Sequence, residues 1–371
     1  MKIVFIPTLP LTFRDYEMLG IKYFHDRNYS VSVLETHQLL LPNYKKNVDI
    51  DYYNYENIYQ PLSEIEFLSF GKTLSKEDYI IYYLGSPDAV MLLNKMKNIT
   101  SAKFVTYISG SIPTTTSPCG YFARMKSFIR PIIKKMIVKK FNTDIVVLGS
   151  PKDELIYPFL IGKDSKKVYA HSRDYELCIN ADEYKNSENY AVFLDTDIVD
   201  ASDYVISKKN YDKNKDIYYD KLITFFEFLE SKMNMEVIIS AHPKSRIFKD
   251  KENFRGHKIV HNNSESLVKN SKFILSEGTT AISFAVYFSK PMMFFTMKEI
   301  DFFANVTCSY AKQFSKTIYN VDDVSTIDIE ILEKELKDLT GYEEFKYNYL
   351  TYKDKNENIY SVIERELLIG R

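Results

Sequence analysis

Short apolar runs alternate with amphipathic stretches along both halves of this sequence of 371 residues. In the first half, strands are predicted at 2–6, 29–34, 79–84, 104–108 and 144–148, and helices at 14–26, 88–96 and 153–159. The second half repeats the pattern, with strands at 190–194, 236–240, 258–261, 273–275 and 291–295 and helices at 217–233, 264–270, 281–288, 329–339 and 359–368. This alternation is typical of parallel sheets covered by helices on both faces. The sequence therefore predicts an α/β fold of two Rossmann-like domains that face a cleft.

A polar segment at 179–190 interrupts the alternation near the middle of the chain and is the expected linker. The length suits two domains of ~100–200 residues each. We expect an N-terminal domain at 1–185 and a C-terminal domain at 186–345, with the helix of 346–371 packing back on the N-terminal domain. Ligands of such sheets bind beyond the carboxyl ends of the strands, so functional residues are expected in the loops that follow strands.

The pattern Leu-Gly-Ser-Pro occurs twice, at 84–87 and 148–151, each time directly after a predicted strand. Serine is a favoured N-cap and proline suits the first turn of a helix. We interpret both copies as punctuation between a strand and a helix, although a helix N-terminus can also bind an anion.

Composition excludes several classes of function. Lys and Arg total 49 against 50 Asp and Glu, which argues against an overall electrostatic grip on nucleic acid. Neither G-x-G-x-x-G nor a Walker-type phosphate loop occurs. Cys119, Cys178 and Cys308 are far apart and odd in number, which favours neither disulfides nor zinc. We expect no cofactor, no metal ion, no membrane span and a cytoplasmic location, because no signal peptide or sufficiently long apolar run is evident.

Two donor-rich loops follow strands of the second half. His242-Pro243-Lys244-Ser245 follows the strand at 236–240, and Ser276, Glu277, Gly278, Thr279 and Thr280 follow the strand at 273–275. His242 and Lys244 can donate to phosphate oxygens, the hydroxyls can do the same, and Gly278 lets backbone N–H groups approach a ligand. Glu277 can accept from ribose hydroxyls. Taken singly, the first loop also fits a turn with an incidental histidine, and the second fits a capped helix start.

The two loops and the elements around them resemble a known family. The runs IISAHPKS and SEGTTAISFAVYFSKPMMFF are similar to the C-terminal domain of bacterial surface-polysaccharide glycosyltransferases of the GT-B architecture. Sialyltransferases, Kdo transferases and pseudaminic acid transferases share this pair of motifs, which there binds the phosphate of a CMP-activated sugar. Glycerophosphotransferases of teichoic acid synthesis have a related tail. The resemblance covers 190–296 well and the N-terminal half only in its layout.

The resemblance implies a donor site in the C-terminal domain, made by His242, Pro243, Lys244, Ser245 and the segment 276–280, and an acceptor-binding N-terminal domain. It implies a metal-independent glycosyltransferase that moves a sugar, with a slight preference for a CMP-linked nonulosonic acid or Kdo, to a surface glycan or lipid-linked glycan in polysaccharide, lipopolysaccharide or capsule synthesis. Two alternatives stay open: a CDP-glycerol-type glycerophosphotransferase, and a non-catalytic nucleotide- or glycan-binding protein.

Three interpretations compete for Asp195-Thr196-Asp197, which follow the strand at 190–194. Asp195 can serve as the general base for the acceptor hydroxyl, a role that the family resemblance supports weakly. The two aspartates can instead form a D-x-D metal site, or an acidic turn that caps the next helix. Asp15 and Glu17, which follow the first strand, are the reserve candidates for the base. His171, near the junction, is expected to be structural or to face solvent.

The segment 123–141 is basic and amphipathic, with seven Lys or Arg and no acidic residue. Such a stretch can lie on an anionic membrane surface, which suits an enzyme acting on lipid-linked glycans. It also fits a packing helix with a solvated basic face. Nucleic-acid binding is not expected, since the charge is local and no aromatic stacking platform accompanies it.

Overall fold

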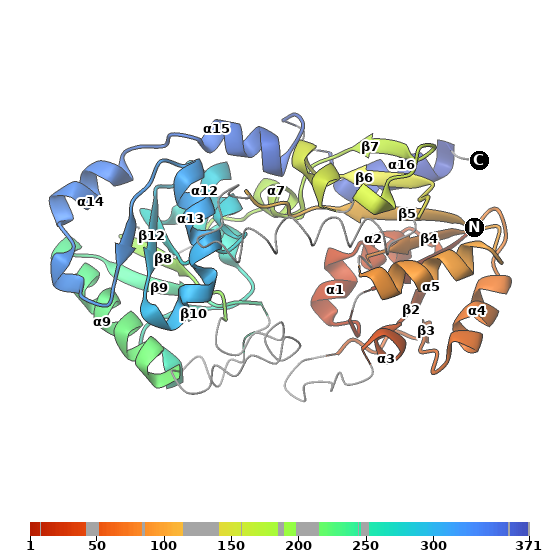
Figure 1. Ribbon diagram of the computed structural model, residues 1–371, viewed down its shortest axis with the longest axis horizontal. Coiled ribbons are helices and arrows are strands. Elements are labelled where there is room, and N and C mark those ends of the chain that lie inside the picture. Colours follow the sequence, from red (N-terminus) through yellow and green to blue (C-terminus); the bar gives the residue numbers. More distant parts are fainter. Residues whose placement is uncertain are drawn as a thin grey trace, which may run out of the picture. The chain divides into compact units, whose positions relative to one another are not determined.

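The computed structural model describes residues 1–7, 9–41, 52–83, 86–113, 141–156, 158–184, 189–197, 215–243, 245, 252–354 and 357–369. The chain forms two compact units. The first comprises Met1–Ser111, Phe122–Arg173 and Thr351–Arg371, and the second comprises Ile112–Tyr121 and Asp174–Leu350. Each contains one parallel sheet with helices on both faces, as the alternation of strands and helices predicts (Figure 1).

The first sheet has seven parallel strands in the order β3-β2-β1-β4-β5-β6-β7. Their bounds are β1 (Lys2–Ile6), β2 (Ser30–Leu34), β3 (Ile58–Tyr59), β4 (Tyr79–Tyr82), β5 (Lys103–Ile108), β6 (Ile145–Leu148) and β7 (Lys166–Tyr169). Ile3 of β1 pairs with Val31 on one side and Tyr79 on the other. The strand order reverses between β1 and β4, which is the point where Rossmann-like sheets bind ligands.

Alternate residues of these strands supply two cores. Ile3 and Phe5 face one core with α1 (Phe13–Met18), α2 (Ile21–Asp26) and α16 (Ile359–Ile369). Val4 and Ile6 face the other core with α4 (Glu64–Lys72) and α5 (Pro87–Lys97). The unit also contains α3 (His37–Leu40) and the 3-10 helices η1 (Pro151–Leu155) and η2 (Pro158–Leu160).

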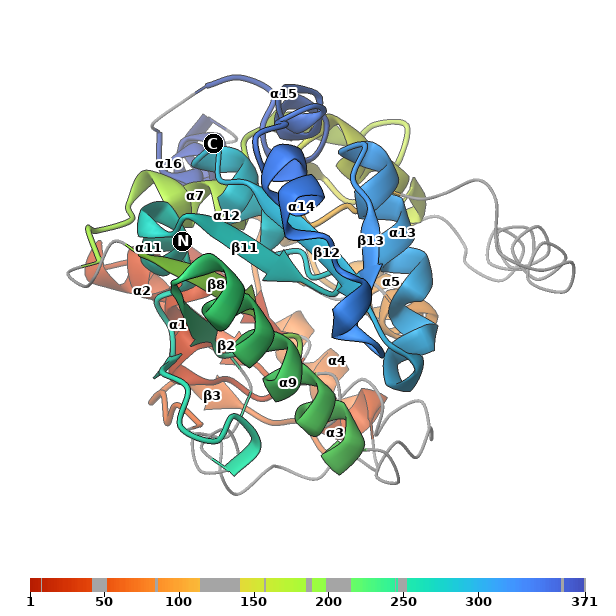
Figure 2. The same cartoon turned by 90° about the vertical axis from the view of Figure 1, so that its left-hand side faces the viewer.

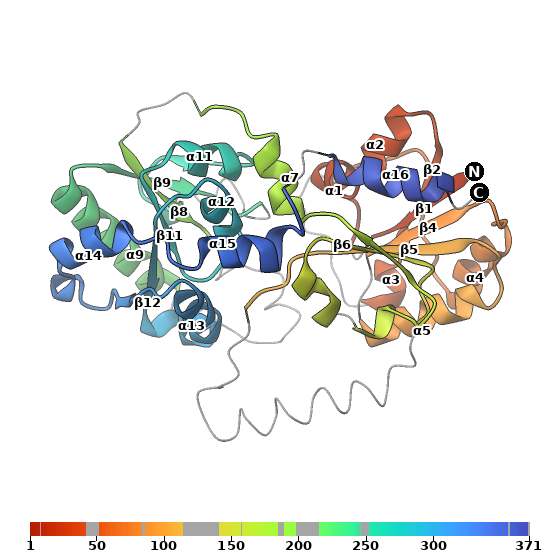
Figure 3. The same cartoon turned by 90° about the horizontal axis from the view of Figure 1, so that it is seen from above.

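The last helix of the chain completes the core of the first unit, where α16 lies beside α2 (Figure 3). Tyr79 in β4 donates to the carbonyl oxygen of Leu367 at 2.7 Å. Tyr23 and Tyr29 each donate to the carboxylate of Glu364, at 2.8 and 2.6 Å. These bonds hold residues from opposite ends of the sequence in one hydrophobic layer.

The predicted helix at 14–26 is two helices, α1 and α2, because Gly20 between them has a left-handed backbone with φ of 83°. A Cβ at this position would collide with the ring of Tyr360, so the close packing of α16 also requires glycine here. Ser86 caps α5 by accepting from the backbone N–H of Ala89 at 3.2 Å, as predicted. In the second Leu-Gly-Ser-Pro copy, Ser150 makes no such bond and a short 3-10 helix follows instead of the predicted α-helix at 153–159.

The second sheet has six parallel strands in the order β10-β9-β8-β11-β12-β13. Their bounds are β8 (Tyr190–Leu194), β9 (Glu236–Ser240), β10 (Ile259–Val260), β11 (Phe273–Ser276), β12 (Met292–Thr296) and β13 (Ile318–Asn320). Figure 2 shows the arrangement, with α9 (Lys215–Met233) across one face of the sheet and α12 (Ile282–Tyr287) and α13 (Ala304–Gln313) on the other. The strand order reverses between β8 and β11.

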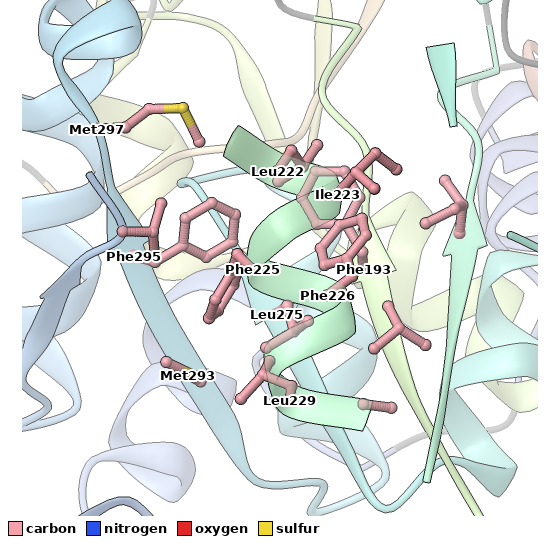
Figure 4. Packing of buried hydrophobic residues seen from close by; sticks show 14 of the residues in the cluster. Phe193, Leu222, Ile223, Phe225, Phe226, Leu229, Leu275, Met293, Phe295 and Met297 are labelled. Atoms are coloured by element: carbon pink, nitrogen blue, oxygen red, sulfur yellow. The ribbon is translucent and has the colours of Figure 1, made fainter. Parts of the chain in front are cut away.

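Two aromatic-rich cores cover the second sheet. On one face, Phe193, Leu275 and Phe295 pack against α9 through Leu222, Phe225, Phe226 and Leu229, as Figure 4 shows, and α14 (Ile329–Leu336) adds Leu332 and Leu336. On the other face, Val192, Ile274 and Phe294 pack against α7 (Arg173–Ile179), α11 (Ser264–Asn270), α12, α13 and α15 (Tyr342–Phe345). The described part of this unit also contains η4 (Lys298–Phe303), η5 (Val324–Thr326) and the π-helix η6 (Lys346–Leu350).

The division between the units differs from the boundaries expected at 185 and 345. The first change of unit in this region falls between Arg173 and Asp174, because Tyr175 and Cys178 of α7 pack into the second core. The change near the C-terminus falls between Leu350 and Thr351, because Phe345 and Leu350 belong to the same core.

Candidate functional site

Three loops lie side by side at the carboxyl edge of the second sheet. They follow β9, β8 and β11, which are neighbours in that order. The two loops singled out by sequence follow the outer two of these strands, and the loop of Asp195 lies between them. The carboxyl edge at a reversal of strand order is the usual ligand site of such sheets, so these loops form the candidate site.

Asp195 ties the β8 loop to the β9 loop. Its backbone N–H donates to the carbonyl oxygen of Ser240 at 3.1 Å, which extends the strand pairing by one residue. Its carboxylate accepts from the backbone N–H of His242 at 3.3 Å and from that of Asp197 at 3.0 Å. Asp197 has a left-handed backbone with φ of 49°, which aspartate tolerates better than most residues. The carboxylate of Asp195 therefore positions the chain at the start of both loops.

Glu277 ties the β8 loop to the β11 loop. Its carboxyl is fully buried and accepts from Thr196 Oγ1 at 3.2 Å. Tyr218 of α9 donates to the same carboxyl, 2.9 Å from one oxygen and 3.0 Å from the other. Burial raises the pKa of Glu277 to about 8, and the nearby charge of Asp195 acts in the same direction. Thr196 and Tyr218 oppose this shift by hydrogen bonding, but burial outweighs them.

Gly278 fits the β11 loop closely against α13. Its φ is 113°, and a Cβ there would lie 3.0 Å from the backbone nitrogen of Thr307. The Gly278 N–H donates to the hydroxyl of Ser276 at 3.0 Å, and the hydroxyl of Thr307 donates to the carbonyl oxygen of Glu277. The loop is thus held from both sides, and only glycine suits its centre.

The structure separates the predicted donor residues into two groups. Ser276 and Glu277 are buried, whereas His242, Ser245 and Thr279 are partly exposed and Pro243 and Thr280 are exposed. Glu277 was expected to accept from ribose hydroxyls, but here its carboxyl is buried and accepts from Tyr218 and Thr196. Ser276 was expected to contact phosphate, and its side chain is buried as well. Lys244 lies outside the described residues.

The helix after the β11 loop also differs from expectation. It begins at Ile282, its N-cap is Ala281, and it has six residues. The two threonines are therefore not its caps: Thr279 Oγ1 accepts from the N–H of Ala281 at 3.3 Å, and the carbonyl oxygen of Thr280 accepts from Ser283 Oγ at 2.7 Å. These contacts shape the turn before the helix.

The sequence did not identify Tyr218 or Thr307 as parts of this cluster, and it gave Thr196 no role of its own. Tyr218 lies on the buried face of α9 and contributes to the apolar pattern of that helix. A buried tyrosine hydroxyl needs a hydrogen-bond partner, which is the signal that could have indicated its role. Thr307 lies on α13, a helix absent from the sequence-based prediction.

The reserve candidates for a base belong to the first unit. Asp15 forms a capping box at the start of α1: its carboxylate accepts from Thr12 Oγ1 at 2.7 Å, and its backbone N–H donates to the same hydroxyl at 3.0 Å. Glu17 is exposed on the same helix. His171 is buried and forms an isolated bridge with Thr351, so of the two expected positions it has the structural one and does not face solvent.

Two other expectations concern metal and membrane. Over the described ranges, no three His, Cys, Asp or Glu side chains are grouped as metal ligands. The structure contains, in the part of the chain that it describes, no helix that is both long and apolar enough to span a bilayer. Of the basic segment 123–141, only Phe141 lies within the described residues, and it is buried.

Comparisons with known proteins identify the fold. No protein-family model and no curated protein matches the sequence. Among solved structures, a UDP-GlcNAc 2-epimerase of Methanocaldococcus jannaschii in complex with UDP-GlcNAc and UDP is 14% identical, with 100% of both chains covered and a TM-score of 0.50. A variant of the wall teichoic acid polymerase TagF is 12% identical, with 99% of this chain and 89% of that chain covered and a TM-score of 0.55. The chain thus has the two-domain, Rossmann-like GT-B fold.

Proposed function

We propose that this chain is a glycosyltransferase that moves a sugar from a nucleotide-activated donor to a surface glycan acceptor. The observation that carries the proposal is the bonded arrangement of three loops at the point where the strand order of the second sheet reverses. Nucleotides bind at this point in Rossmann-like sheets. The loops present His242, Ser245 and Thr279 partly exposed, as a phosphate site requires.

The residues of this site divide into those that contact the donor and those that hold them. In the proposal, His242, Lys244, Ser245, Thr279 and Thr280 donate to the phosphate oxygens, and the backbone at Gly278 approaches the ligand. Asp195 fixes the N–H of His242, and Glu277 fixes the β8 loop through Thr196. Charge that develops on the leaving phosphate is then stabilised by protein donors, without a metal ion.

The general base is the second part of the proposal. Asp195 is the first candidate, because its loop lies between the two donor loops, and Asp15 and Glu17 of the first unit are the alternatives. A carboxylate offers about four lone-pair sites, so a base can take a proton from the acceptor hydroxyl while it keeps hydrogen bonds from backbone N–H groups. For Asp195 those bonds come from the N–H groups of His242 and Asp197, which hold its carboxylate beside the donor loops.

The identity of the donor is a narrower proposal. The sequence motifs favour a CMP-linked nonulosonic acid or Kdo. The fold likeness to the wall teichoic acid polymerase TagF supports a second candidate, transfer of glycerol phosphate from a CDP-glycerol-type donor. The two differ in product, since only the second leaves phosphorus in the new linkage. A third candidate is a binding protein that takes up the nucleotide but transfers nothing.

Binding of CMP, CDP, UDP, GDP and ADP, followed by thermal unfolding, tests the proposal. A ligand at ~100 times its Kd stabilises the folded state by about 2.7 kcal/mol, which is readily measured. We expect at least one nucleotide to stabilise the protein, and His242→Ala to abolish the effect. His261→Ala, on the same unit after β10, is the matched control and should behave as the unchanged protein. No stabilisation by any nucleotide would contradict the proposed donor site.

Membrane attachment is proposed separately. The segment 123–141 carries seven cationic side chains that suit an anionic bilayer surface. Sedimentation with vesicles of phosphatidylcholine alone or with phosphatidylglycerol added tests this. Binding confined to the anionic vesicles, and lost when Lys134, Lys135, Lys139 and Lys140 are replaced by glutamine, is the expected result.

A further inference from the structure

Arg173 places a positive charge at the carboxyl edge of the first sheet. It follows β7, and its guanidinium carbon lies 5.0 Å from the ring centre of Tyr83 and 5.3 Å from that of Tyr107. Tyr83 comes directly after β4, and Tyr107 lies near the end of β5. The guanidinium is therefore held next to the point where the strand order of this sheet reverses, between β1 and β4.

This charge differs from those of three other arginines of the described chain. Arg27, Arg255 and Arg365 each pair with a carboxylate. Among the described residues no ion pair involves Arg173, and its Nε is buried without a hydrogen-bond partner. Burial lowers the pKa of Arg173, but the nearby tyrosines and the charge of Asp15 together outweigh it, and the net pKa is raised. The carboxylate of Asp15 is itself bonded to Thr12 in the capping box.

A guanidinium in these surroundings favours an external anion. Arginine keeps its proton at every accessible pH, so burial cannot be relieved by neutralising the group. Aromatic faces balance part of the charge, but an incompletely paired, partly buried cation still has a free-energy cost. The planar fork of N–H donors matches two oxygens of a phosphate or a carboxylate, and the tyrosine rings hold it in one orientation.

We propose that Arg173 binds an oxyanion of the acceptor, a phosphate or carboxylate carried by the glycan, while Tyr83 and Tyr107 orient the guanidinium. The inference rests on the proposed function, in which the first unit binds the acceptor. It adds that the acceptor is anionic and that its charged group lies at the β4–β5 edge of the first sheet.

Isothermal titration of the full chain with three small probes tests the inference. The probes are glycerol 3-phosphate, glucuronate and neutral glucose. We expect at least one of the two anions to bind more tightly than glucose. Whether glycerol 3-phosphate or glucuronate binds more tightly then identifies the acceptor's anionic group as a phosphate or a carboxylate. Loss of a charge-assisted pair corresponds to ~10- to 100-fold in affinity, which is the weakening expected for Arg173→Met. Arg173→Lys keeps the charge but not the planar fork of donors, so its affinity for the anion should lie between those of the unchanged protein and Arg173→Met.

Arg27→Met is the matched control, because Arg27 also stacks on a tyrosine of the first unit, 3.6 Å from the ring centre of Tyr23, but already pairs with Glu364. It should leave anion binding unchanged. The inference is wrong if neither anion binds more tightly than glucose, or if Arg173→Met binds the anions as the unchanged protein does.

Nucleotide binding by the same variants separates this inference from the proposed function. We expect CMP, CDP or UDP to bind Arg173→Met with unchanged affinity, which also shows that the variant is folded. If nucleotide affinity falls with anion affinity while thermal unfolding is unchanged, Arg173 contacts the donor phosphate and the acceptor assignment is overturned. If Arg173→Met does not fold, Arg173→Lys decides the matter by the same criteria. Donor hydrolysis without acceptor reports on the proposed function independently.

Discussion

The hydroxyl of Tyr218 lies 2.9 and 3.0 Å from the two carboxyl oxygens of Glu277, although the residues are 59 positions apart in the sequence. This pair joins α9, which covers one face of the second sheet, to the loop that follows β11. Because Glu277 also accepts from Thr196, the contact links the β8 and β11 loops to the hydrophobic core below them.

Tyr218→Phe should lower the free energy of unfolding by about 1–3 kcal/mol, because it leaves a buried carboxyl short of a donor. Nucleotide affinity should fall as well, since the loops lose a support. Tyr190→Phe is the matched control: its hydroxyl is also buried in the second unit but donates to the carbonyl oxygen of Leu267. Urea unfolding and nucleotide titration of both variants check this, and equal effects on nucleotide binding would contradict a special role for Tyr218.

Glu277 should make stability depend on pH. Burial raises its pKa from 4.5 in the unfolded chain to about 8, so over this window the folded state holds a proton that the unfolded state has lost. The free energy of unfolding therefore falls as the pH rises from 4.5 to about 8 and levels off above it.

In Glu277→Gln the free energy of unfolding should fall less steeply with pH. Relative to the unchanged protein, the variant should therefore be more stable at about pH 9 than at about pH 5. Denaturant unfolding at a series of pH values measures the difference. Burial raises the pKa of Asp153 to about 6, so this residue also makes the free energy of unfolding fall with pH, but at lower pH. That contribution should persist in Glu277→Gln. Parallel curves for the two proteins would show that Glu277 does not titrate in this window.

Gly278→Ala should lower the stability of the protein by more than the positive φ of Gly278 alone explains. The φ of 113° is costly for alanine, by about 1–2 kcal/mol, and the new Cβ also meets the backbone nitrogen of Thr307 at 3.0 Å. Gly256→Ala is the matched control, because φ is 94° and no atom lies within 4 Å of its Cβ position. The expectation fails if the two variants lose equal stability in thermal unfolding.

Asp195→Asn distinguishes a base from a positioning residue. If Asp195 is the base, the substitution should lower kcat by ~100-fold or more and leave the Kd of the donor close to its original value. As a positioning residue it should chiefly weaken donor binding, because the N–H of His242 loses its carboxylate acceptor. Asp197→Asn, which keeps the backbone N–H that donates to Asp195, is the comparison. If neither parameter changes, Asp15→Asn and Glu17→Gln are next.

The central strands and the positions of the candidate loops could be predicted because they depend on local patterns. The run 190–194 is apolar at every position, and the run 236–240 is apolar at its three central ones, a pattern typical of a strand buried on both faces. The edge strands β3, β7 and β13 escaped prediction because each is short and partly exposed, so neither continuous apolarity nor strict alternation marks it. The break at Gly20 escaped because the apolar period continues across it.

The contacts within the site could not be predicted, because they depend on strand order. The sequence places the two donor-rich loops after the strands at 236–240 and 273–275, but it does not show that β8 lies between those strands. That insertion gives Asp195 and Thr196 their partners on either side. The burial of Glu277 depends on Tyr218, a residue that the sequence shows only as part of an apolar helix face.

The return of α16 to the first unit has a consequence for synthesis on the ribosome. Ile359, Val362, Ile363 and Leu367 fill the same core as Ile3 and Phe5, near the start of the chain. Domains usually fold in the order in which they emerge, but this core lacks one of its walls until residues 359–367 are translated. The second unit, whose residues all precede Thr351, is therefore complete before the first, and a nascent chain released early exposes the apolar surface that α16 would cover.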